Sequence, residues 1–242
     1  MKIDILAFGA HPDDVELSAC GTLLVEQSKG KTIGIIDLTK GELGTRGTAD
    51  TRKLEAQAAA EILGLQVREN LEMEDGFFAY NEENIKKIIA AIRAFEPEIV
   101  LCNATWDRHP DHGKGGNITV DACFLSGLRK IETFKNGINQ SRWRPKQVFQ
   151  YVQDQAVPYH ILVDISAVMP QKIAAIKAYT TQFNNANNTE PSTYISKPNF
   201  LDAVINKHQL YGKNIGVNFA EAFSSPKKIG VNSLFNLVLE ET

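Results

Sequence analysis

Apolar runs of strand length alternate with helix-like segments in the first half of the chain, and this alternation constrains the fold most strongly. The runs cover Ile3–Gly9, Thr32–Thr39, Gln66–Leu71 and Glu98–Cys102. Continuous apolar runs of this length are typical of strands that are covered on both faces. The helix-like segments that follow these runs are Asp14–Ser28, Asp50–Leu63, Asn84–Phe95 and Gly115–Ile131. The alternation predicts a three-layer, Rossmann-like α/β domain with a largely parallel sheet and helices on both faces.

The second half of the chain is less regular. We expect strands at Gln147–Val152 and Ile161–Ile165, and helices at Ser166–Phe183 and Phe200–Gly216. Val217–Phe223 is interpreted as a lid or an edge segment, and the polar, turn-rich stretch Asn184–Thr193 as a mobile loop. No break in composition divides the 242 residues, so we expect a single domain spanning residues 1–242.

Composition excludes several classes of function. The chain has 26 Lys and Arg against 29 Asp and Glu, which gives a net charge of −3 and no general surface for nucleic acid. Cys20, Cys102 and Cys123 are odd in number and widely spaced, which is typical of buried thiols in a reducing compartment. Because the N-terminus runs directly into a predicted strand and no apolar stretch approaches ~18 residues, we expect a cytoplasmic protein with no membrane partner.

Two clusters of titratable residues follow predicted strands. Ala10–Asp14, with the sequence AHPDD, comes directly after the first strand, and Arg108–His112, with the sequence RHPDH, comes shortly after the fourth. In open α/β sheets, ligands bind at the carboxyl ends of the strands. Polar groups at that end are costly to order and add nothing to a core. We therefore expect both clusters to contribute to one site.

The spacing within the clusters indicates a metal site. His11 and Asp14 are three residues apart, as are His109 and His112, so each pair can reach a single ion. Either pair alone is weak evidence, but together they predict mixed His and carboxylate ligands with an open position, which is typical of catalytic zinc. The groups left over, with Asp13 and Asp111 among them, would then serve as acid and base for metal-assisted hydrolysis. The alternative is a pair of proline-containing turns in which Asp13 or Asp14 caps a helix.

Other candidate motifs are weaker. The first loop lacks the G-x-G-x-x-G pattern of dinucleotide sites, and the loop Gly41–Thr48 lacks the Lys-Ser/Thr ending of a phosphate-binding P-loop. That second loop is either a flexible surface loop or one that contacts substrate. His160 and His208 are interpreted as structural or solvated. By default Arg46 and Arg52 are surface cations, whereas Arg108 lies beside the second cluster.

At the AHPDD and HPDH loops the chain resembles the LmbE/PIG-L-like zinc-dependent deacetylases. These enzymes remove acetyl groups from N-acetylglucosamine units, and the resemblance covers nearly the whole chain. The stretch Asp37–Thr48, the pair Thr51-Arg52, Arg108 and the late segment Tyr194–Ser196 look like the bacillithiol-pathway branch. That branch acts on N-acetylglucosaminyl-malate.

The resemblance implies roles for individual residues. The zinc ligands would be His11, Asp14 and His112, with Fe(II) also suited to such a site. Asp13 would be the general base, and His109 the acid or oxyanion stabiliser, oriented by Asp111. The resemblance also implies substrate-binding residues, which are Glu42, Arg46, Arg52 and Arg108. Phe200 stands where some relatives carry a catalytic tyrosine, and Tyr194 lies six residues earlier. By analogy we expect a homo-oligomer, from dimer to hexamer.

Two other functions stay open from the sequence. One is the same deacetylation on another N-acetylglucosamine conjugate, such as a chitobiose-like sugar or a glycolipid. The other is a metal-dependent sugar-binding module without turnover. The presence of Asp13 and His109 argues against the second, because binding alone needs neither an acid nor a base.

Overall fold

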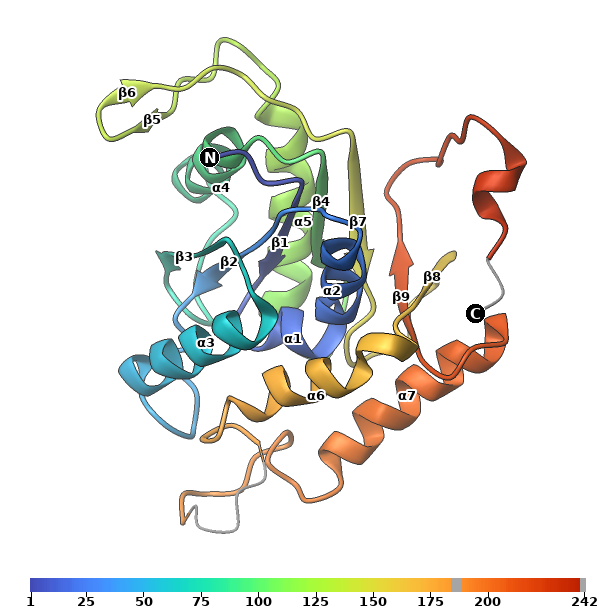
Figure 1. The fold of residues 1–242 in the computed structure, drawn as a ribbon. Helices are drawn as coiled ribbons and strands as arrows, with labels where there is room; N and C mark the ends of the chain where they lie inside the picture. Colours follow the sequence, from blue (N-terminus) through green and yellow to red (C-terminus); the bar gives the residue numbers. More distant parts are fainter. Residues whose placement is uncertain (184–188, 240–242) are drawn as a thin grey trace.

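The structure is a computed structural model that describes residues 1–183 and 189–239. Its main sheet has seven strands in the order β3-β2-β1-β4-β7-β9-β8 (Figure 1). The strands are β1 (Ile5–Gly9), β2 (Ile33–Thr39), β3 (Val67–Met73), β4 (Ile99–Asn103), β7 (Gln147–Tyr151), β8 (Ile161–Asp164) and β9 (Ala220–Ser224). The first five of these run parallel, and β9 runs antiparallel to both β7 and β8. The predicted α/β fold with a largely parallel sheet is confirmed.

Helices cover both faces of this sheet. They are α1 (Asp14–Ser18), α2 (Cys20–Ser28), α3 (Ala49–Leu63), α4 (Glu82–Phe95), α5 (Pro110–Leu125), α6 (Met169–Lys177) and α7 (Phe200–Ile215). Alternate residues of β1 point to opposite faces, as the pleat of a strand requires. Leu6 and Phe8 pack in a core with α4 and α5, whereas Ile5 and Ala7 pack with α1 and α2. The result is three layers around two apolar cores, with α7 packed over β8 and β9.

The order of the strands brings the two predicted loops together. From β1 the chain moves through β2 to β3 on one side, and then returns to form β4 on the other side of β1. The carboxyl ends of β1 and β4 therefore flank the point where the direction of winding changes. This is where ligands bind in open α/β sheets. The AHPDD loop follows β1, and the loop that carries Arg108–His112 follows β4.

Two predicted elements differ around β9, a strand that carries a buried glutamate. The expected helix Asp14–Ser28 is broken at Ala19 into α1 and α2, since the carboxylate of Glu221 accepts the N–H groups of Gly21 (2.9 Å) and Thr22 (2.7 Å). The prediction of a lid or edge segment at Val217–Phe223 is wrong. Its second half forms β9, which is buried between β7 and β8. The buried ammonium of Lys172 balances Glu221 at 2.8 Å.

Other element boundaries also differ from the prediction, and two of the helices involved begin with a proline in the first turn. The helix predicted at Gly115–Ile131 begins instead at Pro110, a residue suited to the first turn, and ends at Leu125. The segment Ser166–Phe183 is a 3₁₀ turn (Ser166–Val168) followed by α6, which has a proline in its first turn. The short hairpin of β5 (Phe134–Lys135) and β6 (Ile138–Asn139) was not predicted.

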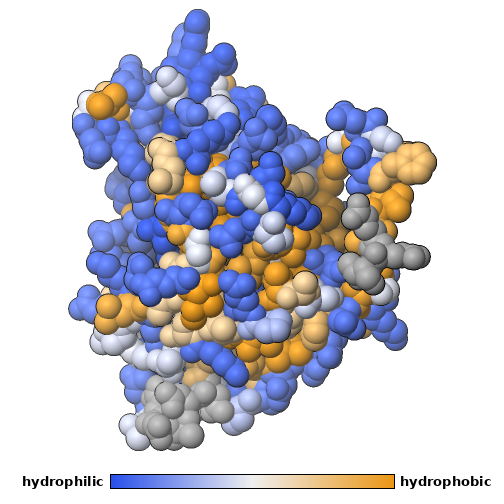
Figure 2. Space-filling view, viewed as in Figure 1, coloured by the Kyte–Doolittle hydropathy of each residue, from blue (hydrophilic) through white to orange (hydrophobic). Residues whose placement is uncertain are grey.

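The surface and the remaining segments agree only in part with the expectations. Cys20, Cys102 and Cys123 are buried, as predicted. Within the described residues no helix is long and apolar enough to cross a membrane. Of the expected mobile loop, residues 184–188 lie outside the described part of the chain. Figure 2 shows a mixed face, hydrophilic at the upper left and with hydrophobic residues through the middle and right. Exposed apolar side chains occur in the C-terminal segment, among them Leu234, Phe235 and Val238.

Candidate metal centre and active site

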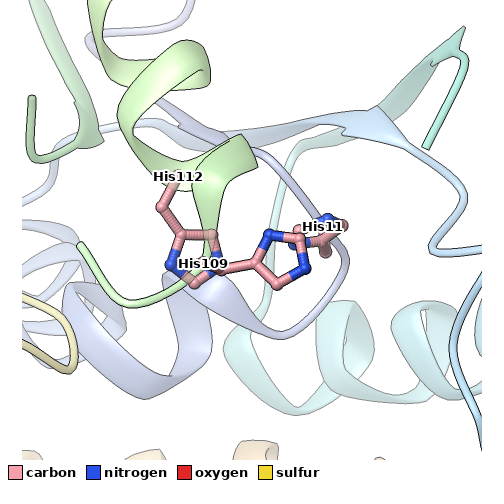
Figure 3. Close-up of side chains that lie close together, drawn as sticks. All are labelled: His11, His109 and His112. Carbon is pink, nitrogen blue, oxygen red and sulfur yellow. The ribbon is translucent and has the colours of Figure 1, made fainter. Parts of the chain in front are cut away.

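Three imidazoles converge between the ends of β1 and β4. His11 lies in the loop after β1, His109 caps α5, and His112 lies in the first turn of that helix. One nitrogen from each ring lies within 4.8 Å of the others, and the rings point toward one another (Figure 3). The ring centroids are 4.7 to 5.4 Å apart. The two predicted loops therefore form one site.

The carboxylate of Asp14 is fixed among these rings by four polar groups. Its Oδ2 accepts the N–H of His11 (3.0 Å) and the side-chain amide of Asn103 (3.1 Å). Its Oδ1 accepts the amide of Gln153 (2.6 Å) and lies 3.1 Å from His112 Nε2. Because Asp14 is 2 % exposed, these contacts hold a buried carboxylate in one orientation.

His112 is oriented by a carboxylate that the sequence analysis did not single out. Its Nδ1 lies 2.5 Å from Asp107 Oδ2, and Asp107 Oδ1 accepts the backbone N–H groups of Asp154 (3.1 Å) and Gln155 (2.6 Å). A proton on Nδ1 leaves the lone pair on Nε2, which faces Asp14. Carboxylate partners of this kind fix the tautomer of metal-binding histidines. The only signal in the sequence was the position of Asp107 beside Arg108.

His11 has the opposite arrangement of its ring. Its Nε2 lies 3.0 Å from Asp75 Oδ1 and 3.4 Å from Asp111 Oδ2, while its Nδ1 lies 3.7 Å from Asp14 Oδ2. The Nδ1 lone pair therefore faces the same side as Asp14. Asp75 follows β3, a strand of the same parallel sheet, so its position at the same edge of the sheet was a signal that the sequence analysis did not use.

The contact between His109 and Asp111 differs from the expected one. The backbone N–H of Asp111 donates to His109 Nδ1 (3.2 Å), whereas the Asp111 carboxylate faces His11, Lys114 and the N–H of Gly76. A neutral His109 ring that accepts at Nδ1 carries its proton on Nε2. It is then a hydrogen-bond donor and not a lone-pair donor at that nitrogen.

This donor set fits a tetrahedral metal ion. Two ligands on one zinc with bonds of about 2.0–2.1 Å lie roughly 3.3 Å apart. Asp14 Oδ1 lies 3.1 Å from His112 Nε2, and the other oxygen, Oδ2, lies 3.7 Å from His11 Nδ1, so both distances are near that value. Among the described residues, two groups have ligand atoms within 4.8 Å of one another, namely His11 with His109 and His112, and His11 with Asp75 and Asp111. Asp14 contacts His11 and His112 of the first group.

Asp13 is strained and is paired with a buried arginine. Its backbone φ is 112°, a conformation that is costly for a residue with a side chain. The guanidinium of Arg52 lies 3.2 Å from Asp13 Oδ2 and donates to the carbonyl of Pro12 (2.8 Å). Arg52 and Arg46 are 6 % and 5 % exposed, so the default interpretation of both as surface cations was wrong.

The charges in the cluster shift its pKa values in opposite directions. Burial would raise the pKa of Asp14, but His112 and His11 outweigh it and hold that pKa well below its usual range. Burial would lower the pKa of His11, but Asp111 and Asp75 raise it to about 10. Burial would also lower the pKa of His112, but Asp14 and Asp107 raise it to about 9. Because a metal competes with these protons, we expect its binding to weaken in acid.

Asp13 and His109 titrate differently from the other groups. Burial raises the pKa of Asp13 to about 7, although Arg52 opposes the shift. Burial, together with the charges of His11 and His112, lowers the pKa of His109. A carboxyl group with a pKa near 7 beside a metal-type donor set is suited to proton transfer.

A pocket of about 630 Å³ opens onto this cluster. Arg52 and Arg108 line it, whereas Glu42 and Arg46 do not appear among its described lining residues. Glu42 instead accepts the N–H of Asp75 (3.0 Å). Arg108 bonds Asp154 (2.8 Å) and lies over the ring of Tyr194, and Phe200 also lines the pocket.

Comparison with known proteins identifies the family. The family described as "PIG-L: GlcNAc-PI de-N-acetylase" matches residues 6–123, which include both loops. The uncharacterized deacetylase YaiS of Escherichia coli is 32% identical over 162 residues, which are 62% of this chain and 83% of that protein. The chain belongs to the PIG-L deacetylase family.

A further relative and a solved structure are similar to most of the chain. Diacetylchitobiose deacetylase of Thermococcus kodakarensis is 29% identical over 74% of this chain and 70% of its own length. The crystal structure of the conserved protein TT1542 from Thermus thermophilus is 34% identical, covers 95% of this chain and 97% of its own, and has a TM-score of 0.84.

More distant relatives differ in what they act on. A probable N-acetyl-alpha-D-glucosaminyl L-malate deacetylase 2 of Bacillus anthracis is 22% identical over 74% of this chain and 81% of its own length. The 4-oxalmesaconate hydratase of Pseudomonas putida is 25% identical over 73% of both. Relatives at this distance therefore include more than one substrate and more than one reaction.

Proposed function

We propose that this protein, as a single domain, is a zinc-dependent deacetylase that converts N-acetylglucosaminyl-malate into acetate and the free amine. The observation that carries the hydrolase proposal is the convergence of the His11, His109 and His112 rings, with Asp14 in contact with His11 and His112 and with Asp13 in the same pocket. Asp13 and His109 are the two residues assigned to proton transfer. A sugar-binding module would have no use for Asp13 and His109. Their presence supports catalysis over binding alone.

The proposed ligands are His11, Asp14 and His112, each held by neighbours in the orientation that a metal requires. Asp107 keeps the proton of His112 on Nδ1, and Asp75 with Asp111 keeps that of His11 on Nε2. When bound, the ion supplies a Lewis acid that polarises the acetamide carbonyl and acidifies a water molecule. An open His and carboxylate site also suits Fe(II), so the metal in the cell is a matter for measurement.

Asp13 and His109 are assigned the proton transfers. Asp13 takes the proton from the attacking water and delivers it toward the leaving nitrogen, which becomes the amine. His109 Nε2–H is available as a donor to the carbonyl oxygen, where negative charge develops. Arg52 holds the Asp13 carboxylate through its contacts with Oδ2 and the Pro12 carbonyl. Asp111 acts on His11 through its carboxylate, which revises the role expected from the sequence.

Malate as the aglycone is supported by the resemblance to the bacillithiol branch and by the Bacillus anthracis relative. The Thermococcus kodakarensis relative favours a neutral disaccharide instead, because its name gives diacetylchitobiose as the substrate. The two substrates differ in charge, so turnover separates them. A homo-oligomer and a cytoplasmic location stay part of the proposal.

The test is acetate release by the purified protein from N-acetylglucosaminyl-malate, diacetylchitobiose and N-acetylglucosamine. We expect the malate conjugate to react fastest, chelation to abolish release, and added zinc to restore it. Asp13→Asn should keep the metal but lose a factor of ~10² or more in rate, the scale of a missing acid or base. Chelator-resistant release would refute the metal mechanism. Faster turnover of diacetylchitobiose would refute the substrate.

A further inference from the structure

One face of α7 forms a wall of the pocket and ends in a lysine. Phe200, Ala203, Val204 and Lys207 all line the pocket, with the spacing of residues on one side of a helix. Three of these side chains are apolar. Lys207 is therefore the one place where this wall presents a charge. The sequence analysis gave Lys207 no role.

The other charged groups that line the pocket are paired. Each of its described lining carboxylates contacts a basic side chain, either an arginine or a histidine. The pairs are Asp13 with Arg52 (3.2 Å), Asp14 with His112 (3.1 Å), Asp75 with His11 (3.0 Å) and Asp154 with Arg108 (2.8 Å). Arg108 is further covered by the Tyr194 ring, at 4.3 Å from its centroid. Lys207 is the cation left over among the described lining residues.

Lys207 has spare hydrogen-bonding capacity. Its Nζ donates to the backbone carbonyl of Gln153, and among the described residues no carboxylate lies within 4.0 Å of it. An ammonium has three donors, so two remain for another partner. Burial, with the nearby charge of Lys172, lowers the pKa of Lys207 to about 8. The surroundings therefore do not fully compensate this charge, and an anion in the pocket would.

We infer that Lys207 forms the anion-binding subsite of the pocket and selects substrates whose aglycone carries a negative charge. The inference rests on the proposed deacetylase function, and it assigns recognition of the aglycone to a residue outside the expected substrate-binding set. A lysine offers a compact point charge, which suits a carboxylate or a phosphodiester oxygen alike. Within the proposed function the group is a malate carboxylate.

The experiment compares charged and neutral ligands on Lys207→Met. Turnover of N-acetylglucosaminyl-malate and of methyl N-acetylglucosaminide gives a selectivity ratio in kcat/KM. We expect this ratio to fall about 10- to 100-fold in Lys207→Met, mainly through KM, as for the loss of a charge-assisted hydrogen bond. Lys207→Arg should recover part of it. Lys213→Met, an exposed lysine on the same helix, is the matched control and should keep the wild-type ratio.

Calorimetric binding of the same two compounds to the Asp13→Asn protein, with and without Lys207→Met, is independent of turnover. If the parent protein binds the charged compound more tightly and Lys207→Met removes this preference, the subsite is supported. This holds even if the wild type releases no acetate, a result that would overturn only the deacetylase proposal. N-acetylglucosaminyl-inositol phosphate as a third probe shows whether a phosphodiester serves as well. Three results would each overturn the subsite. They are the absence of a charge preference in the parent protein, an equal loss of affinity for both compounds in Lys207→Met, and a loss of the preference in Arg108→Met but not in Lys207→Met.

Discussion

Replacing Asp107 by asparagine tests how His112 is prepared for a metal. The introduced amide can keep its oxygen on the backbone N–H groups of Asp154 and Gln155, which lie 3.1 and 2.6 Å from Asp107 Oδ1. It then turns its NH₂ group toward His112 Nδ1, where Oδ2 now lies at 2.5 Å. His112 must accept at Nδ1 and carry its proton on Nε2, the nitrogen that faces Asp14.

The size of the effect follows from this tautomer change. Loss of such an outer carboxylate typically lowers metal affinity 10- to 100-fold, or about 1.4–2.8 kcal/mol. We expect Asp107→Asn to fall in that range in zinc competition against a chromophoric chelator, with unchanged circular dichroism. Asp121→Asn on α5, the helix that carries His112, is the control, because its exposed carboxylate accepts a hydrogen bond from the Tyr80 hydroxyl. An affinity within twofold of wild type would refute the assignment of Asp107.

Two further predictions concern stability. A Cβ on Gly116 would lie 2.3 Å from the carbonyl oxygen of Asn103 and 2.6 Å from that of Ala104. We therefore expect Gly116→Ala to lower the free energy of unfolding by ~1–3 kcal/mol or more. Gly230→Ala is the control and should leave it unchanged, because the space around Gly230 is open. Equal urea midpoints for the two variants would contradict this packing. Burial, with the charges of Lys172 and Lys207, holds the pKa of His208 well below 6.5. Below pH ~6.5 the unfolded chain therefore binds more protons at His208 than the folded chain does. As the pH falls, this difference lowers the free energy of unfolding by up to ~1.4 kcal/mol per pH unit, and His208→Gln should lack this dependence. Denaturation curves at pH 7.5 and 5.5 measure this pH dependence, and His160→Gln, at an exposed histidine, is the control. Parallel pH profiles of stability for wild type and His208→Gln would contradict the prediction.

The resemblance and the sequence motifs predicted much of the site, but not what surrounds it. His11, Asp14, His109 and His112 were expected to meet, and they do, because each follows a strand whose burial is visible as an apolar run. The supporting residues were missed. Gln153 lies 139 positions from Asp14, and Asp75 lies 64 from His11, so no local spacing connects them.

The substrate-binding residues show the same limit. Arg52 and Arg108 were expected to bind substrate because of the family resemblance. Both line the pocket, but Arg52 is paired with Asp13 and Arg108 with Asp154. Lys207 was not predicted because a lysine on an amphipathic helix is usually solvated. Its placement depends on how α7 packs, which its own sequence does not reveal.

By itself the sequence determined the alternation of strands and helices, the parallel sheet and the two loops, since these depend on neighbouring residues and on burial patterns of short period. Only the tertiary structure decided that β9 enters the sheet, that Glu221 divides α1 from α2, and that Asp107 and Asp75 orient the two histidines. Most of these contacts join residues far apart along the chain. Their energies depend on the packing of whole elements, which no local pattern encodes.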